Sequence, residues 1–336
     1  MRALRFHGPS DLRLEQVPDP VADVVVRVSA CGVCGSDVHF LDGSARTAYT
    51  PITLGHEIAG VVARSQSEEW PEGTEVLVLA GGHCGVCPRC REGRPNLCER
   101  SEVMGIDIDG GLADLVAVRP DMLIHRPEGV SATDAATAVD AGATAWHAVT
   151  RRAGVAPGDA VAIIGVGGLG GYAVQIARGA GASPVIAADT DPKRLEDARR
   201  FGADEVILVE ERKSLGRAVK LLTGGGADKA LEFVGQASTV DAAVKSLRPG
   251  GVAVAVGVGI EPITTLPPVL WSNNEYTLTG SYGSLPGDVD AILAGLADGR
   301  LRAPAIEETP LEEAAASILS LAQGERLTAG RLMVIP

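Results

Sequence analysis

The pattern of apolar and polar residues divides the chain into two kinds of segment. In the first hundred residues, short apolar runs such as 24–28, 57–63 and 75–79 are separated by turns rich in Gly, Pro, Ser and Asp. Short strands broken by such turns are typical of a mainly β domain. From about Ser131 onward the apolar residues instead recur in longer segments of helical period. We therefore expect a β-rich part followed by an α/β part.

The pattern of the α/β part predicts alternating strands and helices. Strands and helices that alternate in this way wind into a doubly wound parallel sheet with helices on both faces. The predicted strands are 161–164, 185–188, 205–208, 230–234, 252–256 and 276–280, and the helices between them are 169–180, 193–201, 215–222 and 239–247. Two further helical segments, 289–296 and 311–321, precede a short apolar end.

The first predicted strand of this sheet runs directly into a glycine-rich turn. Residues 161–170 read V-A-I-I-G-V-G-G-L-G and lead into the helical pattern that continues to residue 180. The spacing G-x-G-x-x-G between a strand and a helix is typical of dinucleotide-binding sites. Glycines there let a diphosphate approach the backbone amides at the helix N-terminus. The glycines concerned are Gly165, Gly167, Gly168 and Gly170.

An acidic residue follows the glycine turn at the distance that a dinucleotide site requires. Asp189 ends the second predicted strand, where its carboxylate can accept both hydroxyls of the adenosine ribose and repel a 2′-phosphate. This favours NAD over NADP. Lys193 and Arg194 argue the other way, because either side chain can pair with a phosphate of the cofactor. Asp189 could instead cap the next helix, although Asp191, directly before Pro192, is better placed for that role.

Length and composition restrict the class of protein. A chain of 336 residues is long enough for two domains with separate cores, and a formal net charge of −13 argues against a nucleic-acid partner. The longest apolar runs fall short of the ~18 residues that span a bilayer, and the N-terminal residues lack the apolar region of a signal peptide. We therefore expect a cytoplasmic protein that does not insert into membranes.

Four cysteines form a compact group in a polar loop. They follow the pattern C-x2-C-x2-C-x7-C among Gly, Pro and Arg residues. Four thiolates this close in sequence can surround one tetrahedral Zn²⁺ and leave no position open for a substrate, so the predicted site is structural. The alternative is four free or disulfide-bonded cysteines. The residues are Cys84, Cys87, Cys90 and Cys98.

A second set of candidate metal ligands is scattered along the chain. Cys34 lies in C-G-V-C-G-S-D-V-H, and His56 and Glu57 lie in G-H-E. Taken singly, a Cys is most often a small buried hydrophobic residue and a His a hydrogen-bonded structural one. Asp140 stands among small and apolar residues, where a carboxylate is costly to bury unless it is paired or bound to a metal. It could also cap a helix beginning at Ala141.

These motifs, taken together and in this order, resemble the zinc-dependent alcohol dehydrogenase family of the medium-chain dehydrogenase/reductase superfamily. The resemblance covers essentially the whole chain. It implies a Rossmann domain of doubly wound parallel sheet and a mainly β, GroES-like catalytic domain with a zinc lobe. The implied domain bounds are 1–137 for the catalytic domain, with its lobe at about 81–100, 138–282 for the NAD-binding domain, and 283–336 for the C-terminal part of the catalytic domain.

The resemblance also implies a catalytic zinc held by Cys34 and His56. It makes Glu57 a carboxylate that can approach the metal, and Asp37 the acceptor that orients His56, as a carboxylate does for a ligating imidazole. Many family members have a cysteine as third ligand. Here that position is Asp140, which we interpret as the third ligand; an oxygen in place of a thiolate should bind zinc less tightly.

Further site residues follow from the same resemblance. Ser36 and His39 match a proton relay from the substrate hydroxyl, and Thr144 and Leu169 match positions that contact the nicotinamide ring. The implied enzyme is an NAD-dependent zinc alcohol dehydrogenase. Its substrate, bound in the cleft between the domains, is a small alcohol, with a secondary one favoured. It is converted to the aldehyde or ketone by hydride transfer to NAD, or formed in the reverse reaction.

Two other functions stay open at this point. Related zinc enzymes reduce conjugated C=C or iminium substrates, and Ser36 and His39 argue weakly against that activity. Some relatives of the superfamily are non-catalytic dinucleotide-binding proteins, although such a role would not need Cys34 and His56. Relatives are homodimers or homotetramers, and the strand at 277–282 is a candidate for pairing across a twofold axis.

Overall fold

The computed structural model describes residues 1–210, 212–325 and 330–336, and the chain forms two compact units. The first unit joins Met1–Ala143 to Leu285–Pro336, and the second is Thr144–Ser284. The sequence prediction placed the first boundary after residue 137. In the structure a helical run continues through that point, and Asp140 therefore belongs to the first unit.

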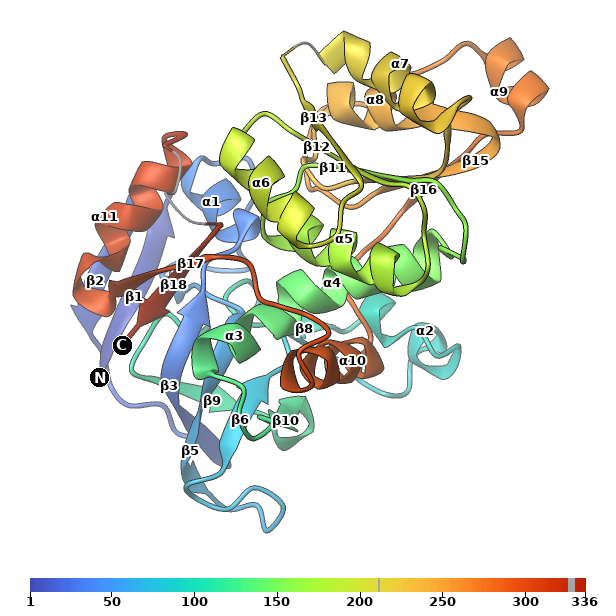
Figure 1. The fold of residues 1–336 in the computed structure, drawn as a ribbon. Coiled ribbons are helices and arrows are strands. Elements are labelled where there is room, and N and C mark those ends of the chain that lie inside the picture. The colour runs from blue at the N-terminus through green and yellow to red at the C-terminus, as the bar shows by residue number, and fades with distance from the viewer. Residues whose placement is uncertain (211, 326–329) are drawn as a thin grey trace. The chain divides into compact units, whose positions relative to one another are not determined.

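The first unit is built mainly of antiparallel strands (Figure 1). One sheet has the order β2-β1-β4, a larger one has the order β10-β6-β5-β3-β18-β17 with β9 also paired to β3, and β7 and β8 form a short ribbon. The strands are β1 (Arg2–Gly8), β2 (Asp11–Gln16), β3 (Val24–Gly32), β4 (Ile52–Thr53), β5 (Glu57–Ser65), β6 (Glu75–Val78), β7 (Gly81–Gly82), β8 (Glu102–Val103), β9 (Leu115–Val118), β10 (Leu123–His125), β17 (Ile306–Pro310) and β18 (Arg331–Ile335).

Strand β3 is the centre of the larger sheet, and its sequence explains why. Seven of its nine residues are buried, which is the near-continuous apolar run expected of a strand covered on both faces. The C-terminal strand β18 pairs antiparallel with the end of β3, where Met333 lies opposite Gly32 and Val334 opposite Cys31. The last residues of the chain therefore complete a sheet that begins near its N-terminus.

Helices complete the first unit, and some of them carry candidate ligands. They are α1 (Gly35–Leu41), α2 (Pro88–Arg91), α3 (Ala132–Thr137), α10 (Pro286–Ala297), α11 (Leu311–Ala322), two 3₁₀ turns (Pro95–Leu97 and Pro120–Met122) and a π-helical turn (Ala138–Gly142). Helices α10 and α11 confirm the two helical segments predicted at the end of the chain. The sequence pattern predicted strands and turns where α1 forms. That helix begins at a capping box in which Asp37 Oδ2 accepts the Cys34 N–H at 2.9 Å.

The segment around Asp140 is a continuous helical run. Ser131 caps its start by accepting the Asp134 N–H at 3.0 Å, and α3, the π-helical turn, α4 (Ala143–Trp146) and a second π-helical turn (His147–Arg152) follow without a break. The interpretation of Asp140 as a helix cap is therefore wrong, because its own N–H lies inside the run. Single π-helical turns occur frequently at functional sites.

The second unit is a six-stranded parallel sheet with the order β13-β12-β11-β14-β15-β16. This is the strand order of a Rossmann sheet, and it confirms the predicted fold class. The strands are β11 (Val161–Ile164), β12 (Val185–Asp189), β13 (Glu205–Leu208), β14 (Ala227–Glu232), β15 (Leu247–Ala255) and β16 (Thr277–Gly280), and the helices are α5 (Gly168–Gly179), α6 (Pro192–Arg200), α7 (Arg212–Thr223), α8 (Ala237–Ser246) and α9 (Pro268–Asn274). Figure 1 shows α5 and α6 on one face of the sheet and α7 and α8 on the other.

The strand order reverses between β11 and β14, and the carboxyl ends of these two strands frame a crevice in such sheets. The glycine-rich turn begins at the end of β11, and Glu232 ends β14. Small buried residues such as Ala162, Ala188 and Ala230 let the helices pack close to the sheet. The dinucleotide motif therefore lies where an open parallel sheet binds ligands.

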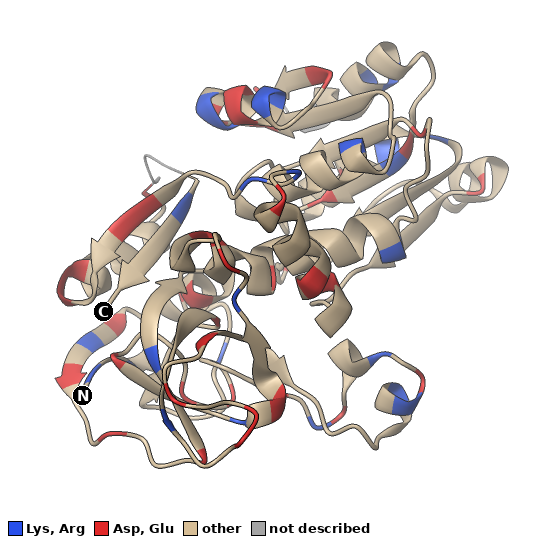
Figure 2. Ribbon diagram, turned by 60° about the horizontal axis from the view of Figure 1, so that its bottom comes forward, with Lys and Arg blue, Asp and Glu red and all other residues tan. Residues whose placement is uncertain are grey.

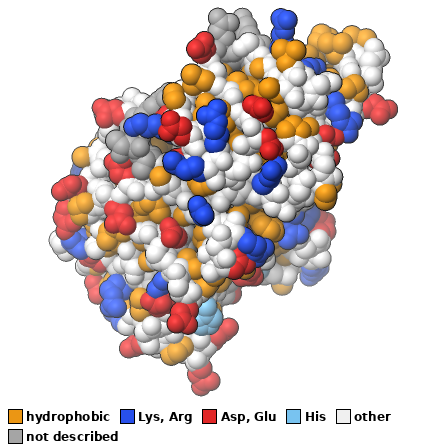
Figure 3. All heavy atoms as spheres, viewed as in Figure 1, with side chains coloured by type: hydrophobic (Ala, Val, Ile, Leu, Met, Phe, Trp, Pro, Cys, Tyr) orange, Lys and Arg blue, Asp and Glu red, His pale blue; other side chains and the backbone are white. Residues whose placement is uncertain are grey.

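Charged residues are spread over both units (Figure 2). On the face drawn in Figure 3, acidic and basic side chains are intermixed, and no extended surface of one sign is seen there. Among the helices of the described residues, none is long and apolar enough to cross a bilayer.

Candidate metal centres and dinucleotide site

The four cysteines of the predicted lobe converge on one point. Their Sγ atoms all lie within 4.8 Å of one another, with the Cys87 and Cys90 sulfurs 3.5 Å apart. Two backbone N–H groups, of Cys84 and Arg100, donate to Cys98 Sγ at 3.3 and 3.4 Å. None of the four cysteines is in a disulfide, so of the alternative that the sequence left open only free thiols remain. A four-sulfur cluster with N–H donors fits a tetrahedral zinc.

The loop lowers the pKa of one of these thiols and raises the pKa of another. Hydrogen bonds from the backbone N–H groups of Val86 and Cys87 lower the pKa of Cys84 to about 6. Burial and the neighbouring sulfurs raise the pKa of Cys90 to about 12. Four thiolates side by side repel one another, and a divalent cation among them removes that repulsion. The ribbon of β7 and β8 closes the base of the lobe.

The scattered candidate ligands also come together, and all of them lie in the first unit. Cys34 caps α1, His56 directly precedes β5, and Asp140 lies in the π-helical turn. Asp140 Oδ2 is 3.3 Å from Cys34 Sγ and 3.6 Å from His56 Nε2. With Glu57 these residues form a group in which one donor atom of each lies within 4.8 Å of the others. A sulfur, a nitrogen and an oxygen so placed fit a zinc that keeps a fourth position open.

The electrostatics of this cluster favour a cation. Burial alone would lower the pKa of His56, but hydrogen bonds to Asp140 and Cys34 and the negative charge of Asp37 raise it well above its usual value. The groups that favour a proton on His56 are the groups that favour a metal ion beside it. The cluster is therefore built for positive charge.

Glu57 is held by an arginine that the sequence analysis missed. Arg331, the first residue of β18, donates from Nε to Glu57 Oε2 at 2.9 Å, and a second ion-pair contact joins its guanidinium to Oε1. Both side chains are almost fully buried. Burial lowers the pKa of Arg331, yet an arginine stays charged in proteins. A single Arg in a terminal strand forms no recognisable sequence motif. Its position beside Glu57 becomes visible only from the pairing of β18 with β3.

The predicted hydrogen bond between Asp37 and His56 is not made. Asp37 Oδ1 and His56 Nδ1 are both buried without a hydrogen-bond partner among the described residues, while Asp37 Oδ2 accepts the Cys34 N–H. Asp37 therefore orients the loop of Cys34, and it acts on His56 through its charge. The capping box of α1 fixes its carboxylate in this direction.

The two residues of the expected proton relay both lie on α1. Ser36 Oγ is 3.9 Å from Cys34 Sγ, which places the hydroxyl at the edge of the ligand cluster. His39 is partly exposed, and its Nδ1 lies 3.0 Å from Ser44 Oγ and 3.4 Å from Asp42 Oδ2. The contacts that fix the imidazole thus use Nδ1.

In the second unit the glycine turn has the geometry that its sequence predicts. Gly165, after β11, has a φ of +84°, and a Cβ at Gly170 would lie 1.9 Å from the Gly165 carbonyl oxygen. Only glycine, which has no Cβ, lets the end of the strand and the start of the helix come this close. Gly167 caps α5, and Gly168 and Leu169 form its first turn, so backbone N–H groups at the helix start remain for a diphosphate.

Asp189 ends β12 and binds the glycine turn. Its Oδ2 accepts the Val166 N–H at 2.8 Å, and its Oδ1 accepts the Asp191 N–H at 2.9 Å. Asp191 caps α6 by accepting the Lys193 N–H at 2.9 Å, as expected. Arg194 Nη1 lies 3.9 Å from Asp189 Oδ2, and it is the side chain nearest a Cβ built at Gly167. Thr144, the first residue of this unit, is buried in α4.

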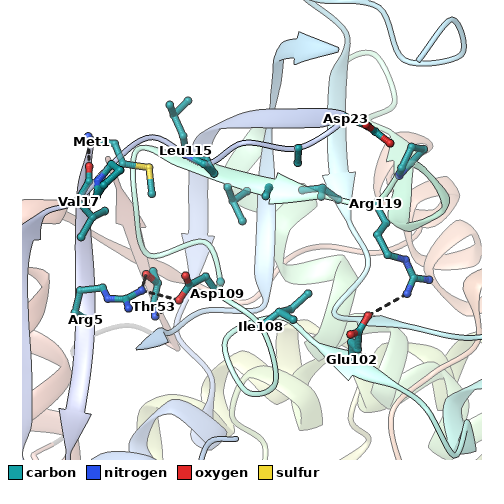
Figure 4. Close-up of a pocket in the computed structure, with 18 residues that line it drawn as sticks. Met1, Arg5, Val17, Asp23, Thr53, Glu102, Ile108, Asp109, Leu115 and Arg119 are labelled. Carbon is teal, nitrogen blue, oxygen red and sulfur yellow. Dashed lines mark hydrogen bonds and ion pairs between the residues drawn. The ribbon is translucent and has the colours of Figure 1, made fainter. Parts of the chain in front are cut away.

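A separate cavity of about 800 Å³ in the first unit contains none of the predicted site residues (Figure 4). Its lining includes Met1, Val17 and Leu115. Of the charged side chains that Figure 4 labels, Arg5 is paired with Asp109 at 2.6 Å and Arg119 with Glu102 at 3.2 Å.

The chain is similar to known dehydrogenases over its whole length. Residues 20–128 match the alcohol dehydrogenase GroES-like domain, and residues 168–298 match the zinc-binding dehydrogenase domain. An NAD-dependent alcohol dehydrogenase of Sulfurisphaera tokodaii is 30% identical over the whole of both chains. The crystal structure of the alcohol dehydrogenase of Aeropyrum pernix superposes with a TM-score of 0.91 at 32% identity, covering all of both chains. An acetophenone reductase of Geotrichum candidum, solved in complex with NAD, superposes with a TM-score of 0.88 at 29% identity, covering 100% of this chain and 97% of the other.

The chain belongs to the zinc-dependent alcohol dehydrogenase family of the medium-chain dehydrogenase/reductase superfamily. It is an oxidoreductase that interconverts alcohols and carbonyl compounds with NAD and zinc, as the motifs predicted. The GroES-like and Rossmann fold classes are confirmed as well.

The four-sulfur cluster predicts that the loss of one cysteine affects stability more than chemistry. We expect Cys98→Ser to lose one of two zincs per chain and to lower Tm by roughly 5–10 °C, because metal binding there contributes to folding. Elemental analysis and thermal unfolding measure both effects. Cys31→Ala, which alters a buried cysteine outside both clusters, should keep two zincs. A well-folded, active wild-type protein with a single zinc would contradict the assignment.

Proposed function

We propose that the chain is an NAD-dependent alcohol dehydrogenase acting on small secondary alcohols and their ketones, with its catalytic zinc held by Cys34, His56 and Asp140. The observation that carries this proposal is the convergence of one sulfur, one nitrogen and one carboxylate oxygen in the first unit, with the oxygen 3.3 Å from the sulfur and 3.6 Å from the nitrogen. The substitution of a carboxylate for the usual cysteine resembles some secondary-alcohol dehydrogenases. The name of the Geotrichum relative agrees, because acetophenone is a ketone.

Each residue of the cluster has a distinct part in the proposal. When bound, zinc supplies a Lewis acid that polarises the substrate oxygen and favours loss of the alcohol proton. Glu57, neutralised by Arg331, keeps a carboxylate beside the ligands without adding net charge. The four-cysteine cluster holds the second, structural zinc and takes no part in the chemistry.

The proton follows residues of α1 in this proposal. Ser36 Oγ, at the edge of the ligand cluster, would accept the proton of the alcohol while its own hydroxyl proton leaves toward His39 through the nicotinamide ribose, as the resemblance to the family implies. His39 is fixed through Nδ1 by Ser44 and Asp42, and its partly exposed ring passes the proton toward solvent. When bound, NAD would supply the acceptor of the hydride, or NADH its donor in the reverse reaction.

The dinucleotide in this proposal binds at the glycine turn of the second unit. The N-terminus of α5 at Gly167 and Gly168 would hold the diphosphate, Asp189 would accept the ribose hydroxyls, and Leu169 would contact the nicotinamide ring, as its match to the family implies. Arg194, beside Gly167 and Asp189, lies where it can pair with the diphosphate. Thr144 contacts the nicotinamide ring, as its match to the family implies.

The other functions receive no support of their own. Reduction of conjugated C=C or iminium substrates would need no hydroxyl beside the ligands, whereas Ser36 Oγ stands 3.9 Å from Cys34 Sγ. A non-catalytic binding protein would need no converging ligand set. We therefore keep the alcohol dehydrogenase as the proposed function and make these two activities outcomes of the assay.

We propose further that the protein is a cytoplasmic homodimer or homotetramer. Strand β16 is the last strand in the sheet order, so one of its edges is unpaired among the described residues, and Val269 and Leu270 on α9, a helix that packs on the neighbouring β15, are exposed apolar residues. Six free cysteines suit a reducing compartment. Light scattering should give a mass two or four times that of the 34.5 kDa chain, and Thr279→Pro on β16 should lower it. A monomer at micromolar concentration would contradict the assembly.

A matched pair of substrates tests the proposed function. With NAD, the zinc-loaded protein should oxidise 2-butanol with a higher kcat/KM than 1-butanol, followed by the absorbance of NADH. The same preparation with NADH should leave the C=C bond of 2-cyclohexen-1-one unreduced. Reduction of that bond without alcohol oxidation would favour the reductase, and NADH binding without turnover of any substrate would favour a binding protein.

The role of Asp140 predicts how metal content responds to substitution. Asp140→Ala and Asp140→Asn should lower zinc toward one per chain and reduce kcat/KM by about a hundredfold or more, because two protein ligands hold the metal poorly. Asp140→Cys should keep two zincs, since a thiolate suits zinc. The control Asp134→Asn, on the same helical run, should change neither quantity. Full metal and near-normal turnover in Asp140→Asn would contradict the ligand role.

The position of Asp189 predicts the choice of cofactor. We expect Asp189→Gly to raise the KM for NAD by about tenfold or more and to raise the relative use of NADP, because it removes ribose hydrogen bonds and charge repulsion. Asp189→Asn keeps the size and one acceptor oxygen, so it removes the charge together with one of the two bonds from the Val166 and Asp191 N–H groups. Steady-state kinetics with both cofactors measure the change. A wild-type preference for NADP would contradict this role.

A further inference from the structure

A buried carboxylate at the end of β14 has no part in the chemistry described so far. Glu232 has an exposed fraction of 0%, and its Oε1 accepts three hydrogen bonds. The donors are the N–H groups of Val234 and Gly235, at 2.7 and 2.9 Å, and the hydroxyl of Thr239, at 2.7 Å. Its Oε2 is buried without a partner among the described residues. A buried carboxylate is costly, so this arrangement needs a reason.

The three donors belong to one turn and to the helix that follows it. Val234 and Gly235 lie between β14 and α8, and Thr239 lies in the first turn of α8. Glu232 therefore ties the end of its own strand to the start of the next helix. Without that carboxylate, two backbone N–H groups of the turn would lose their acceptor.

The turn is also locked to the loop after β15. A Cβ at Gly235 would lie 2.2 Å from the Val258 carbonyl oxygen, and one at Gly259 would lie 1.8 Å from the Gly235 carbonyl oxygen. The two backbones therefore pack directly on each other, which only glycines allow. The position of the loop at 257–259 thus depends on the turn that Glu232 holds.

The same turn contacts the dinucleotide motif. A Cβ built at Gly165 would lie 2.7 Å from Cγ2 of Val234, so the Val234 side chain rests against the first glycine of the turn after β11. Val234 is 39% exposed and Val258 61% exposed, although both follow buried strands. Two apolar side chains are thus presented at the carboxyl ends of β14 and β15, beside the point where the strand order reverses.

The position in the sheet indicates which half of the cofactor meets this surface. Asp189 ends β12, on the other side of β11, and is the residue for the adenosine ribose. A doubly wound sheet binds the two mononucleotide halves on opposite sides of its first strand. The nicotinamide half is therefore expected at the carboxyl ends of β14 and β15. The flat aromatic nicotinamide ring can pack against two apolar side chains there.

We propose that Glu232 is a positioning residue for the nicotinamide half of the dinucleotide. It holds the turn that carries Val234, and the loop that carries Val258 packs on that turn. These two side chains form the apolar surface for the nicotinamide half. The proposal rests on the dinucleotide site proposed above. Burial raises the pKa of Glu232, and the bonds from Thr239, Gly235 and Val234 oppose that rise only in part. Since the three donors need one acceptor oxygen, a glutamine can replace the glutamate.

Two ligands separate this role from a general loss of structure. NADH carries both halves of the dinucleotide, whereas ADP-ribose lacks the nicotinamide ring. In titration calorimetry of the zinc-loaded full-length protein, Glu232→Ala should weaken NADH binding by about tenfold while ADP-ribose binding changes less than about threefold. Glu232→Gln should bind NADH within about threefold of wild type, because its amide oxygen accepts the same bonds.

Two more variants complete the test. Thr239→Val keeps the shape and removes one donor, so it should weaken NADH binding by about threefold and leave ADP-ribose unchanged, even if Glu232→Ala fails to fold. Glu205→Ala, at the exposed start of β13, is the control and should change neither. Equal weakening of both ligands in Glu232→Ala and Thr239→Val, or no weakening in either, would overturn the positioning role. A wild-type protein that binds neither ligand would instead contradict the proposed function.

Discussion

The balance of buried charge around His56 is the constraint on which the candidate active site depends. Cys34, Glu57, Asp140 and Asp37 bring acidic groups into one largely buried region. Arg331 neutralises Glu57 through a buried two-contact ion pair. The remaining acidic groups surround His56 and raise its pKa, so the region favours a cation at the point where Cys34, His56 and Asp140 meet. A zinc ion at this point would balance the negative charge that these residues bring together.

This balance requires segments that are far apart in the sequence. Cys34 and His56 flank strands near the N-terminus, Asp140 lies in a helical run past residue 130, and Arg331 begins the last strand. The pairing of β18 with β3 brings the C-terminal residues to the ligand cluster, so the sheet is the framework for the charges. In the second unit, Glu232 and Asp189 play a similar part, because each fixes a turn beside β11 through buried hydrogen bonds.

The motifs made of neighbouring residues could be predicted from the sequence. The four cysteines, the glycine turn with Asp189 and the alternating strands of the second unit each depend on local spacing, and the structure places them as expected. Arg331 could not be found in this way, because one arginine in a short strand has no pattern. The short helix α1 was also missed, since it depends on the capping box of Asp37 rather than on apolar periodicity. That capping box turns Asp37 toward Cys34, and the expected bond to His56 is therefore absent.

X-ray absorption at the zinc edge tests the two-site account most directly. Four sulfurs on one ion and a single sulfur, from Cys34, on the other predict an average of about 2.5 sulfurs per zinc in protein with two zincs per chain, with nitrogen and oxygen completing the shells. An average of about four sulfurs, with one zinc per chain, would mean that the site of Cys34, His56 and Asp140 holds no metal. An average of about two would mean that Cys34 is not a ligand, and either result would contradict the account.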